Sequence, residues 1–291
     1  MLQYPQWLKP DLLQIGPVRV RWYGIMYLLG FLIGRQLARY LCSIRYCKIR
    51  KDLVDDFLIY LFVGMLLGAR AVYMLIYYKP TPEDPFLWYT PFAVWQGGLA
   101  FHGAVLGMFI ACVLFGRIQK VPFWNLTDTL ALAGSQGIIW GRIGNFINSE
   151  LLGRPTDSVM GMQFPVRDFE GTILGYTEPR HPSQLYEALG EGLIPFAIIW
   201  LIRPRIANQG VLGGIWVCLY AIARFLIEFF REKDQQLDYY FGMTMGQLLC
   251  ATMFLLGLTV IVWCKRKAVP VYSLSDSTPD QTDASATPPS Q

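Results

Sequence analysis

Long apolar runs dominate the chain, and polar residues gather in the stretches between them. A membrane-spanning helix needs about 20 predominantly apolar residues, and seven runs approach that length: residues 20–38, 53–78, 97–116, 125–147, 186–202, 211–230 and 243–264. A helix satisfies its own backbone hydrogen bonds, which hydrocarbon cannot do for it. The pattern therefore predicts an all-α polytopic membrane protein with seven transmembrane helices.

The overall composition agrees with this prediction. Hydrophobic residues make up 54% of the chain, charged residues only 16%, and the mean hydropathy is +0.34. These values are too apolar for an ordinary soluble domain. The net charge of +4 comes without a basic stripe interleaved with aromatic residues, so the expected surroundings are membrane lipids and no nucleic acid partner is expected.

Lysine and arginine are unevenly distributed between the two sides of the predicted bundle. Residues 35–51 hold six of them, residues 265–267 hold three, and both groups follow odd-numbered runs. Cytoplasmic loops of membrane proteins carry an excess of basic residues. We therefore expect an extracytoplasmic amino terminus and a cytoplasmic carboxyl terminus.

Two segments do not fit the helical pattern. Residues 148–185 are polar and broken by glycine and proline, which predicts a small extracytoplasmic cap inserted in a membrane domain of residues 1–268. Residues 269–291 are rich in serine, threonine, proline and aspartate towards their end. This composition predicts a disordered cytoplasmic tail.

The run Gly141–Gly153, GRIGNFINSELLG, brings charge and amides out of the fourth apolar segment. An ionisable side chain at the centre of a membrane costs about 2.5–3.5 kcal/mol, so Arg142 requires a partner, a cavity or a ligand. Asn145 and Asn148 follow Arg142 at intervals of three and extend a polar stripe, and the run ends with Glu150 and Gly153. The alternative is helix packing through small residues, with Arg142 paired to Glu150 or to another helix.

The sixth apolar run carries a second polar stripe, because Tyr220, Arg224 and Glu228 recur every four residues. The planar fork of arginine suits phosphate oxygens. Arg224 and Arg142 together thus indicate an anion site near the outer half of the membrane, whereas an internal Arg224–Glu228 ion pair is the simpler alternative. The depth of a third embedded arginine, Arg70, leaves its role open.

A histidine and a tyrosine near the outer ends of other helices are further candidates. His102, in the third run, has an ordinary pKa of about 6.5 and can accept a proton near neutrality, although a lone histidine is as often structural. Tyr23 stands where aromatic side chains meet the membrane surface and can touch a lipid head group. With only His102 and His181 in the chain and no cysteine cluster, a metal site is not expected.

Several motifs resemble those of bacterial prolipoprotein diacylglyceryl transferases. They are the run Gly141–Gly153, the FHG at Phe101–Gly103, the RHPSQLYE at Arg180–Glu187, the WYG at Trp22–Gly24 and the spacing of Tyr220, Arg224 and Glu228. The resemblance extends over nearly the whole chain up to the tail. One departure is Ala104, where the family often has a second glycine.

The resemblance implies an enzyme of the bacterial inner membrane, with its active site towards the extracytoplasmic side. No soluble cofactor or metal is then expected, because both implied substrates are embedded in the membrane. It would transfer the diacylglyceryl group of phosphatidylglycerol to the lipobox cysteine of a preprolipoprotein signal peptide, forming a thioether and releasing glycerol 1-phosphate. The implied catalytic residues are His102 as the base, Arg224, Glu228, Tyr23 and Tyr220, and the implied residues for phosphatidylglycerol are Arg142, Asn145, Asn148, Glu150 and Gly153. The rival functions are a transporter or channel for an anion or phospholipid, and a scaffold whose charges pair with a partner helix.

Overall fold

The structure is a computed structural model that describes residues 2–15, 18–44, 46–81, 86–94, 97–168, 171–232 and 242–271. It is mostly helical. The α-helices of the described residues are α1 (Trp22–Ser43), α2 (Val54–Val72), α3 (Phe101–Ile118), α4 (Phe123–Gly134), α5 (Gly137–Asn148), α6 (Ser183–Glu187), α7 (Ile194–Ile202), α8 (Val211–Ile227) and α9 (Met245–Lys267). Short 3-10 turns cover Lys51–Leu53, Thr90–Phe92 and Arg203–Arg205, and π-helical segments cover Tyr73–Tyr77 and Ala188–Leu193.

Each predicted apolar run contains helix, and the structure is consistent with a polytopic membrane protein. Among the described residues, three continuous helical segments are long and apolar enough to cross a membrane: Lys51–Tyr77, Ser183–Arg205 and Met245–Lys267. The apolar helices His102–Ile118 and Val211–Ile227 are shorter. The number of seven spans and their orientation stay predictions.

The fourth predicted run is not one helix, because α4 ends at Gly134 and α5 begins at Gly137. The side chain of Gln136 stabilises the break. Its amide nitrogen donates to the carbonyl oxygen of Gly30 in α1 at 2.8 Å, and its amide oxygen accepts from the indole nitrogen of Trp140 at 2.7 Å. Broken helices in membranes need such partners for the backbone groups that the break releases.

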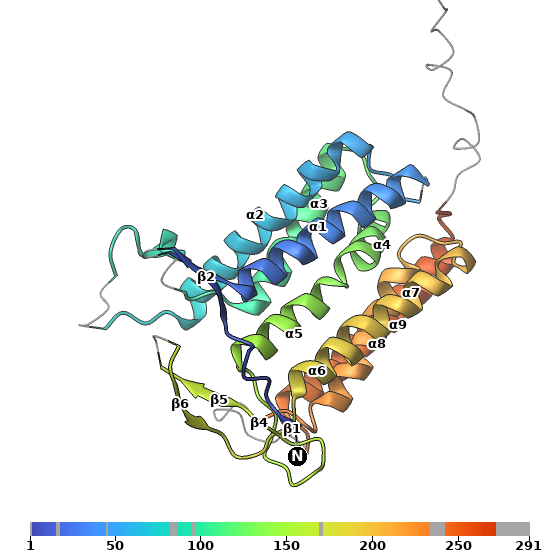
Figure 1. The fold of residues 1–291 in the computed structure, drawn as a ribbon. Coiled ribbons are helices and arrows are strands. Elements are labelled where there is room, and N and C mark those ends of the chain that lie inside the picture. The colour runs from blue at the N-terminus through green and yellow to red at the C-terminus, as the bar shows by residue number, and fades with distance from the viewer. Residues whose placement is uncertain are drawn as a thin grey trace, which may run out of the picture.

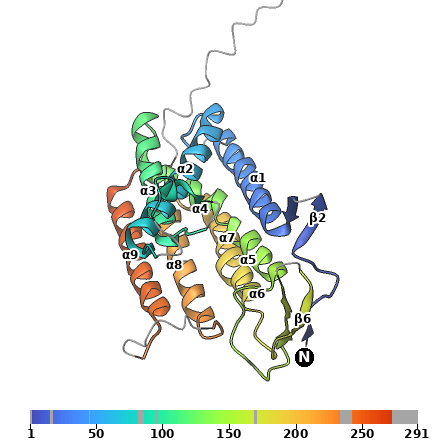
Figure 2. The same ribbon diagram turned by 90° about the vertical axis from the view of Figure 1, so that its left-hand side faces the viewer.

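The broken helix lies in the middle of the molecule. Figures 1 and 2 show α4 and α5 between a group formed by α1, α2 and α3 and a group formed by α6 to α9. α1 packs on both α4 and α5, while α5 contacts the π-helical segment Ala188–Leu193 and α4 contacts α8. A residue on α5 can therefore reach side chains from the second group.

A side chain from α4 caps the amino terminus of α8. Asp128 is fully buried, and its carboxylate accepts hydrogen bonds from the backbone nitrogens of Gly210 and Gly213, both at 2.7 Å. Gly210 has a φ of 83°, a conformation that glycine adopts without strain. A negative charge at a helix amino terminus satisfies free N–H groups and interacts favourably with the helix dipole. The contact fixes the start of the helix that carries Arg224.

Four glycines bring α2 and α3 into close contact. Gly64 and Gly68 on α2 face Gly103 and Gly107 on α3, and a Cβ atom added at Gly107 would collide with the carbonyl group of Gly64. Membrane helices associate mainly through such close packing of small residues. The amino-terminal turn of α3, which carries His102, is thus held against α2.

We expect Gly107→Ala to lower the midpoint of thermal unfolding in detergent, because the added methyl group forces the two helices apart at a cost of about 1–3 kcal/mol. Gly24→Ala is the matched control. A Cβ atom added there meets nothing within 4 Å, and alanine is the better helix former. An unchanged midpoint for Gly107→Ala would contradict the packing described here.

The description of the protein as all-α is incomplete, because the described residues also form three two-stranded sheets. β1 (Leu2–Gln3) pairs in parallel with β4 (Met162–Gln163), β2 (Asp11–Ile15) pairs antiparallel with β3 (Val18–Arg21), and β5 (Pro165–Arg167) pairs antiparallel with β6 (Ile173–Tyr176). β4, β5 and β6 lie in the predicted cap. Such short strands leave no apolar run in the sequence, which is why the pattern did not reveal them.

The cap is attached to the helices by the amino-terminal segment. Tyr4 packs in a small core with Met162 and Phe164, and its hydroxyl group donates to the carbonyl oxygen of Ile147 at 2.8 Å. Ile147 is close to the end of α5. The cap is thereby held where α5 leaves the bundle.

The described chain ends with a segment packed on the helices. Val271 is fully buried in the main apolar core, and its backbone nitrogen donates to the carbonyl oxygen of Ala207 at 2.8 Å. Residues 269–271, assigned to the tail by their sequence, thus have a defined place. The rest of the predicted disordered tail, residues 272–291, lies outside the described residues.

Candidate active site

Two glutamates with no exposed surface lie on the helix that begins at Ser183. Glu187 ends α6, and Glu191 lies four residues later in the π-helical segment Ala188–Leu193. Taking a carboxylate out of water costs several kcal/mol unless cations and hydrogen bonds compensate. Both glutamates therefore require positive partners.

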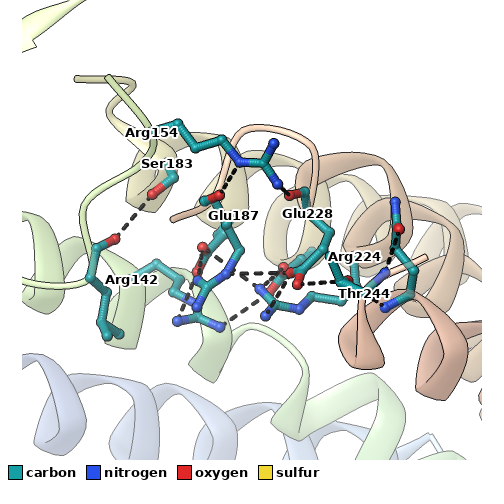
Figure 3. A network of polar contacts seen from close by, with 11 residues as sticks. Arg142, Arg154, Ser183, Glu187, Arg224, Glu228 and Thr244 are labelled. Carbon is teal, nitrogen blue, oxygen red and sulfur yellow. Dashed lines mark hydrogen bonds and ion pairs between the residues drawn. The ribbon is translucent and has the colours of Figure 1, made fainter. Parts of the chain in front are cut away.

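Arginines from two other helices supply these partners (Figure 3). Arg142 on α5 contacts Glu187 at 2.7 Å and Glu191 at 3.3 Å. Arg224 on α8 contacts the other oxygen of Glu191 at 3.2 Å, so that a single carboxylate bridges the two guanidinium groups. The two arginines singled out in the sequence thus converge on one point.

Two further charged residues complete the cluster. Glu228 lies 3.3 Å from Arg224, and Arg231 contacts Glu187 and lies 3.6 Å from Glu228. We call the six residues Arg142, Glu187, Glu191, Arg224, Glu228 and Arg231 the arginine–glutamate network. Its three positive and three negative charges balance, and the three arginine side chains keep 17–20% of their surface exposed.

Glycines in the π-helical segment allow the neighbouring helices to approach. A Cβ atom added at Gly192 would lie 2.7 Å from the side chain of Ile139, which stands three residues before Arg142 on α5. One added at Gly190 would lie 2.8 Å from Ile227, three residues after Arg224 on α8. π-Helical segments inside helices are frequent at functional sites. Here the segment, which contacts both α5 and α8, carries Glu191 between these two helices.

The amino terminus of α9 holds the outer carboxylate of the network. The hydroxyl group of Thr244 donates a hydrogen bond to Glu228 Oε1 at 3.1 Å, and the Thr244 hydroxyl oxygen itself accepts one from the backbone nitrogen of Gln247 at 3.1 Å. Thr244 and Gln247 form a capping box, in which each side chain bonds to the backbone of the other residue. Thr244 thus links the start of α9 to Glu228.

Replacing Thr244 by valine keeps the shape of the side chain but removes both hydrogen bonds. We expect a loss of about 1–2 kcal/mol of stability, since the helix loses its cap and Glu228 loses a donor. Thermal unfolding in detergent measures the effect. Thr244→Ser keeps the hydroxyl group and should unfold near the wild-type midpoint, so equal losses in the two variants would refute this role.

The end of the run Gly141–Gly153 is hydrogen-bonded to the segment just before α6, and the next residue is hydrogen-bonded to the segment just after α8. The backbone nitrogen of Gly153 donates to the carbonyl oxygen of His181 at 3.0 Å, and a Cβ atom added at Gly153 would lie 2.6 Å from the carbonyl oxygens of His181 and Phe230. Arg154 donates to the carbonyl oxygen of Arg231 at 2.7 Å. Gly153 is therefore required here for a close backbone approach.

Asn145, Asn148 and Glu150 come together as the polar stripe predicts. The side-chain nitrogens of Asn145 and Asn148 lie 2.7 Å and 3.4 Å from the same oxygen of Glu150. Glu150 is exposed, and its backbone carbonyl oxygen accepts from the side chain of Gln184 at 2.6 Å. Glu150 does not pair with Arg142 in any ion pair of the described residues, because the buried glutamates on α6 take that place.

The predicted tyrosines lie on helices that adjoin this region. Tyr23 packs against Gly144 of α5, where an added Cβ atom would lie 2.9 Å from its ring, and its hydroxyl group is 3.0 Å from that of Tyr27. Tyr220 is half-buried one turn before Arg224 and stacks on Trp216, with 5.6 Å between ring centroids.

His102 is exposed as the second residue of α3. α3 packs mainly on α2 and α4, whereas α5, α6, the π-helical segment and α8 carry most of the network. His102 was assigned as the base through the family resemblance, and its part in a reaction stays a prediction.

Two other residues prove structural. Arg70 donates to the carbonyl oxygens of Thr90, Pro91, Gly97 and Gly98, so this buried arginine holds the segment before α3. His181 lies 3.3 Å from the hydroxyl group of Tyr186, and burial lowers the pKa of its imidazole. A neutral imidazole suits a structural role for His181 in the segment before α6.

No functional role was predicted from the sequence for the two fully buried carboxylates of the network, Glu187 and Glu191. Both stand at the edge of or inside the apolar run 186–202. The cost of an embedded charge, which drew attention to Arg142, applies equally to Glu191 and would have identified it.

Comparison with known proteins places these residues in a family. The family described as prolipoprotein diacylglyceryl transferase matches residues 10–263. A relative from Allorhizobium ampelinum, named phosphatidylglycerol--prolipoprotein diacylglyceryl transferase, is 40% identical over 280 residues, which cover 92% of this chain and 93% of the relative. A relative of the same name from Francisella tularensis subsp. holarctica is 40% identical over 268 residues, covering 90% of this chain and 95% of that protein.

Proposed function

The chain belongs to the prolipoprotein diacylglyceryl transferase family, and we propose from this membership that it transfers the diacylglyceryl group of phosphatidylglycerol to a prolipoprotein. This transfer is the first step of lipoprotein maturation. The acceptor is the thiol of the lipobox cysteine in the signal peptide. Its sulfur attacks the saturated glycerol carbon, the bond from that carbon to the phosphate oxygen breaks, and glycerol 1-phosphate leaves with the bonding electrons.

The observation that carries this proposal is the convergence of Arg142 and Arg224 on Glu191. Negative charge grows on the phosphate oxygen as its bond to carbon breaks, and fixed cations in a water-poor site stabilise that charge. Two guanidinium groups that meet from separate helices can take one phosphate between them, each through its planar fork. Arg142 binds the phosphate, and Glu228 orients Arg224 from 3.3 Å away.

Glu191 occupies the position between the two arginines before the lipid arrives. Its oxygens lie 3.3 Å from Arg142 and 3.2 Å from Arg224. The phosphate replaces these contacts in part, so the network keeps both guanidinium groups in place at little cost until the substrate binds. Glu187 stays bound by Arg142 and Arg231 and holds the cluster together.

The remaining candidates surround the head group. Asn145, Asn148 and Glu150 bind the glycerol hydroxyl groups of phosphatidylglycerol by amide and carboxylate hydrogen bonds, and Gly153 keeps the backbone close enough to shape this part of the site. Tyr23 and Tyr220 position the lipid. These assignments rest on the family resemblance and on the nearness of the residues to the network.

The thiol must lose its proton for attack, because a cysteine with a pKa of about 8.5 is mostly protonated at neutral pH. His102 is the proposed base. Its exposed position at the start of α3 leaves its side chain accessible to a peptide that approaches from the membrane.

Both substrates are embedded in a bilayer, so the site opens towards lipid. We place seven spans in the inner membrane, with the amino terminus outside and the carboxyl terminus in the cytoplasm, and the network and the cap on the extracytoplasmic side. This orientation follows the distribution of lysine and arginine. The cap covers the head group or guides the signal peptide.

Incubation of the purified protein in detergent with phosphatidylglycerol and a lipobox peptide tests the function. The peptide should gain the mass of a diacylglyceryl group, and glycerol 1-phosphate should appear in equal amount. A transporter or a scaffold would leave both the lipid and the peptide unchanged under these conditions, since detergent contains no compartment. Unmodified peptide with a folded protein would therefore reject the proposal.

A further inference from the structure

A cavity of about 290 Å³ lies at the carboxyl-terminal end of α1. Its lining consists of Gln36, Arg39, Tyr40, Ser43 and Lys51. Figure 1 shows this end of α1 near the start of α2, at the end of the bundle away from α6 and the cap strands. The cavity is thus separate from the arginine–glutamate network.

Arg39 and Lys51 give the cavity positive charge. Among the described residues neither forms an ion pair, and Arg39 Nε is buried without a hydrogen-bond partner. Asp55, whose charge also interacts with Arg39, binds Arg35 at 2.6 Å, and Asp52 binds Arg50 at 2.6 Å. A buried donor of a charged group without a partner is costly, so the site favours an anion.

A third cation, Arg203, lies beside Tyr40 of the cavity lining. The guanidinium carbon of Arg203 lies 5.9 Å from the ring centroid of Tyr40 and 4.5 Å from that of Trp200, and Arg203 Nη1 is also buried without a hydrogen-bond partner. The hydroxyl group of Ser43 and the amide of Gln36 add neutral donors to the lining. Arginine, lysine and hydroxyl groups together are the donors that bind phosphate oxygens.

The outer face of α1 leads from this cavity along an apolar surface. Leu28 and Leu32 are half or more exposed, and Gln36 and Tyr40 follow at the same four-residue spacing. Residues four apart lie on one side of a helix. An acyl chain can therefore lie along α1 while its phosphate reaches the cavity, which argues for a lipid rather than a soluble phosphate.

We propose that this cavity binds the phosphate group of an anionic phospholipid at a site distinct from the site of transfer. Its ligand is held by Arg39 and Lys51, with Arg203 adding to the positive potential. Basic pockets between membrane helices are a recognised way of holding lipid head groups. The proposal does not depend on the proposed function, since it requires no chemistry at the bound lipid.

Native mass spectrometry of the full chain in detergent, titrated with phosphatidic acid, tests the site. The double variant Arg39→Gln, Lys51→Gln should retain phosphatidic acid at least about tenfold more weakly, since each basic residue near a membrane surface contributes about 1 kcal/mol to the binding of anionic lipid. The variant should keep its thermal unfolding midpoint and its transfer of diacylglyceryl. Arg266→Gln, Lys267→Gln, at the exposed end of α9, removes the same charge and is the matched control.

Four outcomes would overturn the proposal. Three of them are an unchanged affinity in the double variant, an equal loss in the control pair, and equally tight binding of zwitterionic phosphatidylcholine. Displacement of the lipid by millimolar inorganic phosphate would refute the assignment to a lipid and leave a site for free phosphate. Weak competition by inorganic phosphate, with loss of binding confined to the Arg39, Lys51 variant, supports it.

Discussion

Arg142→Ala is expected to lower the transfer of labelled glycerol from phosphatidylglycerol to a lipobox peptide by at least about 100-fold. Removal of one donor that stabilises developing negative charge in an enzyme site typically costs a factor of about 100–1,000. Arg142 contacts Glu187 through one nitrogen and Glu191, where it meets Arg224, through the other, so alanine removes one of the two guanidinium groups of the proposed phosphate site. The rate is measured with purified protein in detergent.

Two matched variants separate this effect from a general loss of charge or fold. Arg142→Lys keeps the charge but loses the planar fork, and we expect an intermediate rate. Arg50→Ala removes an exposed arginine that, among the described residues, forms an ion pair with Asp52 alone, and it should be as active as the wild type. Full activity in a folded Arg142→Ala protein would exclude its role as the phosphate ligand.

The positions of the helices were largely predictable, because each apolar run had to satisfy its backbone bonds as helix. The break between α4 and α5 was not, since it depends on the side chain of Gln136 reaching the carbonyl oxygen of Gly30, more than a hundred residues away. The same holds for Asp128 at the start of α8. Long-range hydrogen bonds of this kind leave no periodic pattern in a sequence.

The candidate site was predictable to the extent that burial of charge is costly. Arg142 and Arg224 were identified for that reason, and they do meet. The same cost did not distinguish an arginine that binds a ligand from one with a structural role. Arg70 is of the second kind, because its guanidinium group donates hydrogen bonds to backbone carbonyl oxygens in the segment before α3. The partners of an embedded charge depend on tertiary packing, which one sequence does not reveal.

The carboxylates of the network also change the interpretation of its arginines. The sequence left open whether Arg224 forms a simple ion pair with Glu228 or belongs to an anion site, and the structure contains both the pair and the convergence with Arg142. A neutral cluster of three arginines and three glutamates is stable without a ligand. It also presents two guanidinium groups at one point, so the two alternatives are compatible.

Glu187→Gln is expected to destabilise the protein by about 3–5 kcal/mol, the usual cost of removing one partner from a buried ion pair. Glu187 has no exposed surface and contacts Arg142 at 2.7 Å, Arg231 closely and Arg224 at 3.7 Å. Without its charge, three arginines face two carboxylates. Glu232→Gln is the control. Glu232 is half-exposed and pairs with Arg180, so this substitution should cost at most about 1 kcal/mol.

A double-mutant cycle with Arg231→Gln tests whether this cost comes from unbalanced charge. Arg231 and Glu187 touch each other, so removing both restores the balance of the network, and the loss in the double variant should be smaller than the sum of the two single losses by about 0.5–3 kcal/mol. Thermal and denaturant unfolding in detergent measure the three variants. Strictly additive losses would mean that the two residues stabilise the protein independently, and the network would then be a set of separate contacts rather than one charge-balanced unit.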